Sequence, residues 1–305
     1  MFKQVGIELS RKTMADWMMK SSDLLQPLYD RLHELILTQP VIQADETTLK
    51  VIKEDKSTCY MWLYCSGTDS LAPDNPIPNI VLYDYQRSRS GQCAVDFLEG
   101  YGNYLQVDGY VGYEQTQATL VGCWAHARRK FIEAKQSQPK GKSGKADMAL
   151  NQIQKLYGIE KQINDKSPED KRRLRQDKAL PILNKLNTWL DKSANQVPPK
   201  SALGKAITYT LNQWQKLNCY TNDGNLNIDN NRAERAIKPF VIGRKNWLFA
   251  NTANGARASA ILYSIIETAK ANDLIPFDYL MFLLEQVSLP DYDIEQCLPW
   301  VFAKR

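Results

Sequence analysis

The first forty residues place apolar and polar side chains with the period of an α-helix. Ser10 is a typical N-cap residue for a helix that reaches Lys20, and Ser22 begins a second helical stretch. In this second stretch the apolar residues recur every three or four positions: Leu24, Leu25, Leu28, Leu32, Leu35 and Ile36. We therefore expect two helices in this N-terminal segment.

After residue 40 the period changes to that of β-strands. Three segments are rich in β-branched and aromatic residues and are separated by charged or Pro/Asn/Asp turns: 41–52, 58–66 and 78–85. These segments predict a three-strand meander. A short helix at 92–99, a strand at 104–108 that ends before Gly109, and an apolar strand at 119–124 are expected to follow.

The second half of the chain is mainly helical by pattern. Residues 125–220 are polar and predict three or four helices, with loops at 136–146 and 193–200. An Asn/Asp cluster then caps a new helix near residues 229–231, and the apolar string PFVIGRKNWLFA (239–250) predicts a hairpin. Two further helices are expected at the C-terminal end of the chain: residues 255–273 and 276–287.

This order of elements predicts an α/β fold with an RNase H-like core. Three strands, a helix, a strand, a helix and a strand come first, and a helical insertion then separates the fifth strand from a final core helix. The expected core comprises residues 41–130 and 222–273, with the insertion at 131–221. Helical segments at 1–40 and 274–305 flank it.

Composition narrows the class of protein. The chain has 305 residues, of which 43% are hydrophobic and 24% are charged, as is usual for folded soluble proteins. No run of 18 apolar residues predicts a transmembrane helix, and the first residues lack the apolar core of a secretory signal. The six cysteines form no C-x-x-C pair, which favours reduced thiols in a cytoplasmic protein.

The residues available for catalysis are also limited. There are two histidines, too few for a His-rich zinc site, and Cys123-x-x-His126 supplies two ligands without a second pair. The GKSGK string at 141–145 lacks the first glycine of a Walker A loop. The Gly-x-Gly string at 100–102 lacks the third glycine of a dinucleotide-binding loop. An enzyme built from this sequence must therefore use carboxylates.

Positive charge is concentrated in two segments of the chain. The net charge is +5, but residues 128–145 carry +6 and residues 232–257 carry +5. Two basic segments in an otherwise acidic chain indicate a polyanionic partner. The lysine-rich stretch at 136–147 is equally typical of a solvated loop. In the second segment the basic residues alternate with aromatic ones, including Trp247, which either stacks on an unpaired base or packs in the core.

Three carboxylates occupy the positions where an RNase H-like core holds metal ions. Asp45 lies inside the first strand, Asp108 ends the fourth, and Glu234 lies on the first turn of the helix after the insertion. Carboxylates from separate elements suit two-metal phosphoryl transfer. Periodicity alone does not choose between Asp45 and Glu46. Asp108 is also typical of a turn, and Glu234 lies three residues after Asn231, as in a capping box.

Five strings in this order resemble the insertion-sequence 66 family of bacterial transposases: ADETTLKV (44–51), YLQVDGYVGY (104–113), GCWAHARRKF (122–131), NNRAERAIKPFVIGRKNWLF (230–249) and YSIIETAK (263–270). The resemblance extends from about Gly6 to Leu284. It implies a DDE transposase in which Asp45, Asp108 and Glu234 bind two Mg²⁺ ions, with Mn²⁺ as a substitute. The Asp-Glu-Thr pattern of the family selects Asp45 over Glu46 as the first ligand.

The same resemblance implies that the chain forms a homo-oligomer and binds double-stranded DNA at the element ends and at the target. It also implies a location in the bacterial cytoplasm, at the nucleoid. Helper proteins of the element are further candidate partners, and no membrane is involved. Basic and motif residues expected to contact DNA are His126, Arg128, Arg129, Asn231, Arg235, Lys238, Arg244, Lys245 and Trp247. For His126, a purely structural role is the alternative. The insertion is expected to be a helical subdomain beside the catalytic cleft, with DNA or dimer contacts and no metal ligand.

Family members usually carry a longer N-terminal region with zinc ligands and a helix-turn-helix segment. Residues 6–17 resemble the tail of that region, so the segment 1–40 is interpreted as its remnant. Two other functions stay open. One alternative is a DNA-binding remnant without catalysis that regulates the element. The other is a stand-alone RNase H-like nuclease that cleaves without joining.

Overall fold

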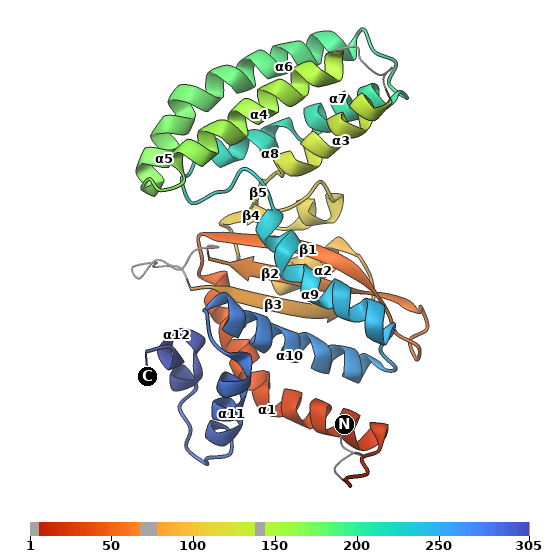
Figure 1. Ribbon diagram of the computed structural model, residues 1–305, viewed down its shortest axis with the longest axis vertical. Coiled ribbons are helices and arrows are strands. Elements are labelled where there is room, and N and C mark those ends of the chain that lie inside the picture. The colour runs from red at the N-terminus through yellow and green to blue at the C-terminus, as the bar shows by residue number, and fades with distance from the viewer. Residues whose placement is uncertain (1–5, 68–77, 138–143, 305) are drawn as a thin grey trace. The chain divides into compact units, whose positions relative to one another are not determined.

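A computed structural model describes residues 6–67, 78–137 and 144–304. The chain divides into two compact units, both drawn in Figure 1. The sheet unit consists of residues 1–101 and 232–305, and the helical unit consists of residues 102–231. The predicted boundaries of core, insertion and terminal segments stay a prediction.

The sheet unit contains the predicted three-strand meander. Its strands are β1 (Val41–Lys50), β2 (Thr58–Ser66) and β3 (Ile80–Gln86), which pair antiparallel in the order β3-β2-β1. In this register Asp45 lies opposite Leu63, and Leu63 lies opposite Tyr83. All three strands are rich in the β-branched and aromatic residues that favour a pleated, half-buried surface.

The helices of the sheet unit lie on both sides of this sheet and at its edge: α1 (Arg11–Leu37), α2 (Gly91–Phe97), α9 (Asn231–Trp247), α10 (Ala253–Ala271), α11 (Pro276–Gln286) and α12 (Pro299–Phe302). Helix α10 covers the edge of β3, where Ser264 Oγ accepts from Tyr83 N and Thr268 Oγ1 accepts from Val81 N. These bonds satisfy donors that an open edge strand would leave available to another chain.

Helix α1 corrects one prediction. Ser10 caps it as expected, since Ser10 Oγ accepts from Thr13 N at 3.0 Å, but the two expected helices are one. Ser22 does not begin a second helix. It is buried inside the first and donates to Met19 O at 2.7 Å. The helix continues because its apolar residues stay on one buried stripe through Ile36.

Helix α9 corrects another prediction, because residues 239–250 do not form a hairpin. The helix is unbroken from Asn231 to Trp247 and includes Pro239. It lies across one face of the sheet (Figure 1), where Ala233, Ile237 and Phe240 enter the core cluster formed with β1, β2 and β3. Their spacing of four and three residues is helical, and burial of this face outweighs the local strand-like composition.

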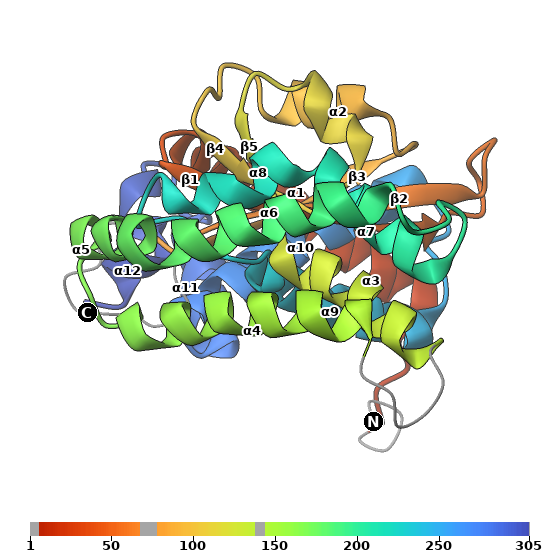
Figure 2. The same ribbon diagram turned by 90° about the horizontal axis from the view of Figure 1, so that it is seen from above.

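The helical unit contains a parallel strand pair and a set of packed helices. Strands β4 (Tyr104–Gln106) and β5 (Thr119–Val121) pair parallel. The α-helices are α3 (Trp124–Gln136), α4 (Lys145–Ile163), α5 (Pro168–Leu174), α6 (Leu180–Ala194), α7 (Ala202–Asn212) and α8 (Trp214–Asn218). Helix α3 contacts α4 and α7, and α6 contacts the same two, so these four close into a bundle (Figure 2).

This unit has more helices than the three or four expected. A π-helical turn at Arg175–Ala179 joins α5 to α6, and the short α8 follows α7 almost directly. The predicted loop near 193–200 is confirmed between α6 and α7, while residues 138–143 of the other predicted loop lie outside the described residues. With antiparallel and parallel pairs among its five strands, the chain is mixed α/β, as expected.

Two further features bear on the predictions from composition. All six cysteines are free and buried, and the expectation of reduced thiols stays a prediction. Among the described residues, no helix combines the length and the apolar character that crossing a bilayer requires.

Candidate active site

The register of β1 distinguishes Asp45 from its neighbour Glu46, a choice that the sequence pattern alone left open. Asp45, like Leu49 on the same strand, lies on the sheet face that α9 covers, because both are in phase with the core residue Leu63. Glu46 lies on the opposite face, where its Oε1 accepts from Arg89 Nε at 2.7 Å, and its side chain is 2% exposed. Asp45 is therefore the β1 carboxylate that faces α9.

Glu234 lies on the first turn of α9, beside residues that fix how this helix rests on the sheet. Its neighbour Ala233 is buried in the core cluster, and Ile237 and Phe240 continue the buried stripe. Glu234 itself is only partly buried, so it lies at the margin of the packed stripe. A side chain in this position is held by the helix and keeps access to the face that Asp45 shares.

Two arginines anchor α9 to the sheet near its two ends. Arg232 donates to Ser66 O at 2.7 Å. Ser66 follows Cys65, the β2 partner of Gln43, so this contact is level with the first residues of β1. Arg244 donates to Thr47 Oγ1 at 3.0 Å, farther along β1. The helix is thus held at one point near the beginning of β1 and at another in its second half.

These anchors show how α9 runs relative to β1. Arg232 and Arg244 are twelve residues apart on the helix, or about 18 Å, and their sheet contacts are about five residues apart along β1, or about 17 Å. The helix therefore runs alongside the strand in the same direction. Glu234 comes two residues after Arg232, so it is level with Gln43, about 7 Å along the strand from Asp45. Both carboxylates are thus on the side of the sheet that α9 covers, near the first half of β1.

Asp108 belongs to the helical unit, two residues after β4. Its Oδ1 accepts from Tyr110 N at 2.7 Å, which confirms that it forms a turn. A Cβ on Gly109 would lie 2.8 Å from the Tyr209 ring, so the turn passes close to α7. Burial first, and then the Asp108 charge, raise the pKa of Tyr209 well above its ordinary value. Asp108 is thus fixed by the backbone and lies near a neutral phenol.

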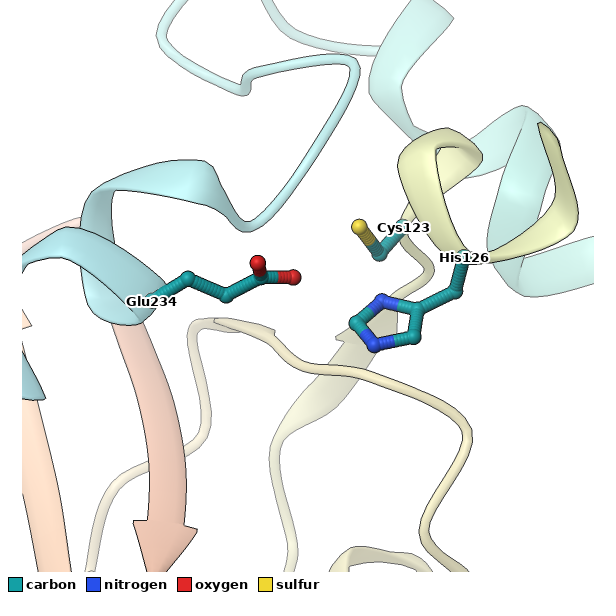
Figure 3. Close-up of side chains that lie close together, drawn as sticks. All are labelled: Cys123, His126 and Glu234. Carbon is teal, nitrogen blue, oxygen red and sulfur yellow. The ribbon is translucent and has the colours of Figure 1, made fainter. Parts of the chain in front are cut away.

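Cys123 and His126 lie at the start of α3, and their ligand atoms are within 4.8 Å of each other. Figure 3 shows both side chains, together with that of Glu234 on α9. Cys123 Sγ accepts from Asn230 N at 3.2 Å, and burial raises the pKa of its thiol to about 12. Because the thiolate is the metal-binding form, this cysteine is better suited to holding the chain before α9 than to holding an ion.

The candidate DNA-binding residues of α9 fall into two groups. Arg235, Lys238 and Lys245 are exposed at spacings of three and seven residues, so they share one stripe of the helix. Arg244 and Trp247 instead make contacts within the unit. Arg244 binds β1, and the Trp247 ring packs edge-on against Phe240 with centroids 5.3 Å apart. For Trp247, packing in the core is the interpretation that this contact favours.

Three other candidates meet in the helical unit. Arg128, Arg129 and Asn231 line a pocket of about 410 Å³ together with Gln154 and Tyr157 of α4. Sequence reasoning singled out the first three, but it missed the two residues of α4. They belong to no recognisable motif, and only packing of α4 against α3 brings them to the same place.

Comparison with known families identifies the chain. A model described as "Transposase IS66 family" matches residues 1–258, and a model described as "IS66 C-terminal element" matches residues 264–300. The chain belongs to the IS66 transposase family. The resemblance inferred from the five sequence strings is thereby confirmed.

Two similar proteins come from Sinorhizobium fredii. "Uncharacterized protein y4jD" is 33% identical over 315 residues, which cover 98% of this chain and 61% of the relative. "Uncharacterized protein y4qI" is 33% identical over 311 residues, covering 97% and 57%. This IS66-family chain thus spans about three fifths of the length of the curated relatives it matches.

Among solved structures, the "Drosophila P element transposase strand transfer complex" covers 87% of this chain and 82% of its own, with 10% identity and a TM-score of 0.25.

Proposed function

We propose that this IS66-family chain cleaves DNA at the ends of its element and joins those ends to target DNA, with Asp45, Asp108 and Glu234 as the ligands of two Mg²⁺ ions on an RNase H-like core. One observation supports this most strongly. In a chain of a transposase family, Asp45 lies on the sheet face that α9 covers and Glu234 lies on the first turn of α9, whereas Glu46 is engaged with Arg89 on the opposite face.

The donor set fits the proposed ions. Carboxylate oxygens are the ligands that Mg²⁺ prefers, and Mn²⁺ accepts the same ligands. When bound, such ions stabilise the charge that develops on the attacking and leaving oxygens of an in-line displacement. Asp45 Oδ1 accepts from Glu46 N at 2.8 Å, which orients its carboxylate. In cleavage, water attacks the phosphorus and the 3′-oxygen leaves. In joining, the freed 3′-hydroxyl attacks a target phosphorus and displaces another 3′-oxygen.

An in vitro assay on DNA carrying the inverted repeats of the element tests the proposal. With Mg²⁺ or Mn²⁺, Asp45→Asn, Asp108→Asn and Glu234→Gln should abolish cleavage and joining but retain DNA binding, which depends mainly on phosphate contacts. The matched control is Glu46→Gln, which removes the neighbouring charge on the opposite face. An Asp45→Asn variant that joins DNA normally would refute the assignment.

The same assay separates the rival functions. Cleavage without joining would identify a nuclease, and binding without cleavage in either metal would identify a DNA-binding remnant. We expect homo-oligomers on the element ends at the bacterial nucleoid, with helper proteins of the element. Light scattering with and without DNA of the element ends measures the oligomeric state.

A further inference from the structure

The pocket between α3 and α4 combines cationic, amide and apolar groups that no catalytic role explains. We propose that it binds a phosphodiester of the DNA backbone, with Arg128 and Arg129 supplying charge and with Gln154 and Asn231 supplying amide donors. This inference rests on the proposed function in one respect, which is that DNA is the partner. It adds α4 of the helical unit to the surfaces that hold DNA.

The pocket is built by two helices that pack against each other. On α3 the lining residues Arg128, Arg129 and Ile132 come three, four and seven positions after Ala125, so they form one face over two turns. Gln154 and Tyr157 are three residues apart on α4 and face them. The volume of about 410 Å³ lies in the range of pockets that enclose small ligands.

The charges in this pocket favour an anion. Arg128 is exposed and makes no ion pair within the described part of the chain, and its guanidinium can donate two parallel hydrogen bonds to a phosphate. A neighbouring carboxylate, Asp229, accepts from the Tyr157 hydroxyl at 3.0 Å and from Asn231 N at 3.2 Å. Two donors therefore compensate this carboxylate.

Tyr157 contributes a neutral wall. Burial first, and then the Asp229 charge, raise the pKa of Tyr157 well above its ordinary value, so its phenol stays uncharged. With Ala125 and Ile132 it supplies apolar surface to the pocket that the two arginines also line, and a charge interaction is stronger beside such surface than in open water. Apolar walls beside cationic donors match a sugar–phosphate unit better than inorganic phosphate, which has no apolar surface.

Two glutamines of the same helix provide a matched test. Gln154 and Gln162 are both exposed on α4, but Gln162 lies eight residues, or about 12 Å, farther along the helix and does not line the pocket. Gln154→Glu should weaken binding of a labelled duplex of the element end about fivefold, because it places a negative charge beside the phosphate. Gln162→Glu should change it less than twofold. Fluorescence anisotropy in EDTA measures both.

Two further variants complete the experiment, with circular dichroism used to confirm folding. Gln154→Lys should tighten binding, which a damaged fold would not do. Arg128→Ala with Arg129→Ala should make the dependence of log K on log salt shallower by up to about 2. If Gln154→Glu and Gln162→Glu bind alike, or if only the affinity for the mononucleotide dAMP responds to Gln154→Glu, the proposal is wrong. Because no metal is present, this result is independent of whether the chain cleaves DNA.

Discussion

Replacing Arg175 with methionine should strongly destabilise the helical unit. This arginine is 2% exposed in the π-helical turn between α5 and α6. Its Nε and Nη2 donate to the two carboxylate oxygens of Glu160 at 2.9 and 2.6 Å. Its remaining bonds go to the carbonyls of Tyr220, Asp223 and Leu226 at 2.8–2.9 Å. One side chain thus ties α4 to the segment that leads into α9.

The magnitude follows from what the substitution leaves behind. Removing one partner of a buried ion pair costs about 3–5 kcal/mol, because the other charge stays buried without compensation. The three carbonyls also lose charged donors, at about 1–3 kcal/mol each, although such losses are not additive. Methionine restores part of the packing. We expect a loss of about 4 kcal/mol in the free energy of unfolding, which corresponds to roughly 15 °C in the melting temperature of a unit of this size.

Circular dichroism during thermal and urea unfolding measures this loss. The matched control is Arg173→Met. Arg173 is 70% exposed and pairs with the partly exposed Asp170 at 2.8 Å, so the control should cost at most about 1 kcal/mol. Adding Glu160→Met to Arg175→Met should recover part of the stability by removing the lone carboxylate. An Arg175→Met protein as stable as the Arg173→Met control would refute this interpretation of the contacts.

Three further predictions concern other parts of the chain. Burial raises the pKa of Asp84 to about 6, above the value of about 3.9 in an unfolded chain, so stability should fall by about 2–3 kcal/mol as the pH rises from about 4 to 6. Asp84→Asn should abolish this dependence in urea unfolding. Gly109→Ala should lower the free energy of unfolding by about 1–3 kcal/mol, because the new Cβ meets the Tyr209 ring, and an unchanged melting temperature would contradict this. Lys245→Ala should make the salt dependence of DNA binding shallower by about 1, whereas Arg244→Ala should lower stability and leave that slope unchanged.

Much of the fold could be predicted from local sequence. The meander of β1, β2 and β3 follows from β-branched and aromatic runs between turns, and Ser10 begins α1 as its side chain predicts. Helix α10 follows from an apolar stripe with helical spacing. The strings around Asp45, Asp108 and Glu234 indicated the family that the comparisons confirm. These signals are local, because each depends on residues within a few positions of one another.

The other features depend on contacts between residues far apart in sequence. Residues 239–250 have the composition of a hairpin, yet most of them, up to Trp247, continue a helix because Ala233, Ile237 and Phe240 bury one face against the sheet. Likewise, Gln154 and Tyr157 line a pocket with Arg128 and Arg129 only because α4 packs on α3.

Some features of the candidate active site follow from the sequence, and others follow only from the tertiary structure. The sequence determined that two adjacent acids lie on one strand and that only one can share a face with α9, because side chains alternate along a strand. Register and packing decided which acid this is. Glu46 is paired with Arg89, which follows β3 and lies 43 residues away, and Asp45 is left on the face that carries Glu234. No local pattern records that choice, since it depends on which residues the folded chain brings to each side of the sheet.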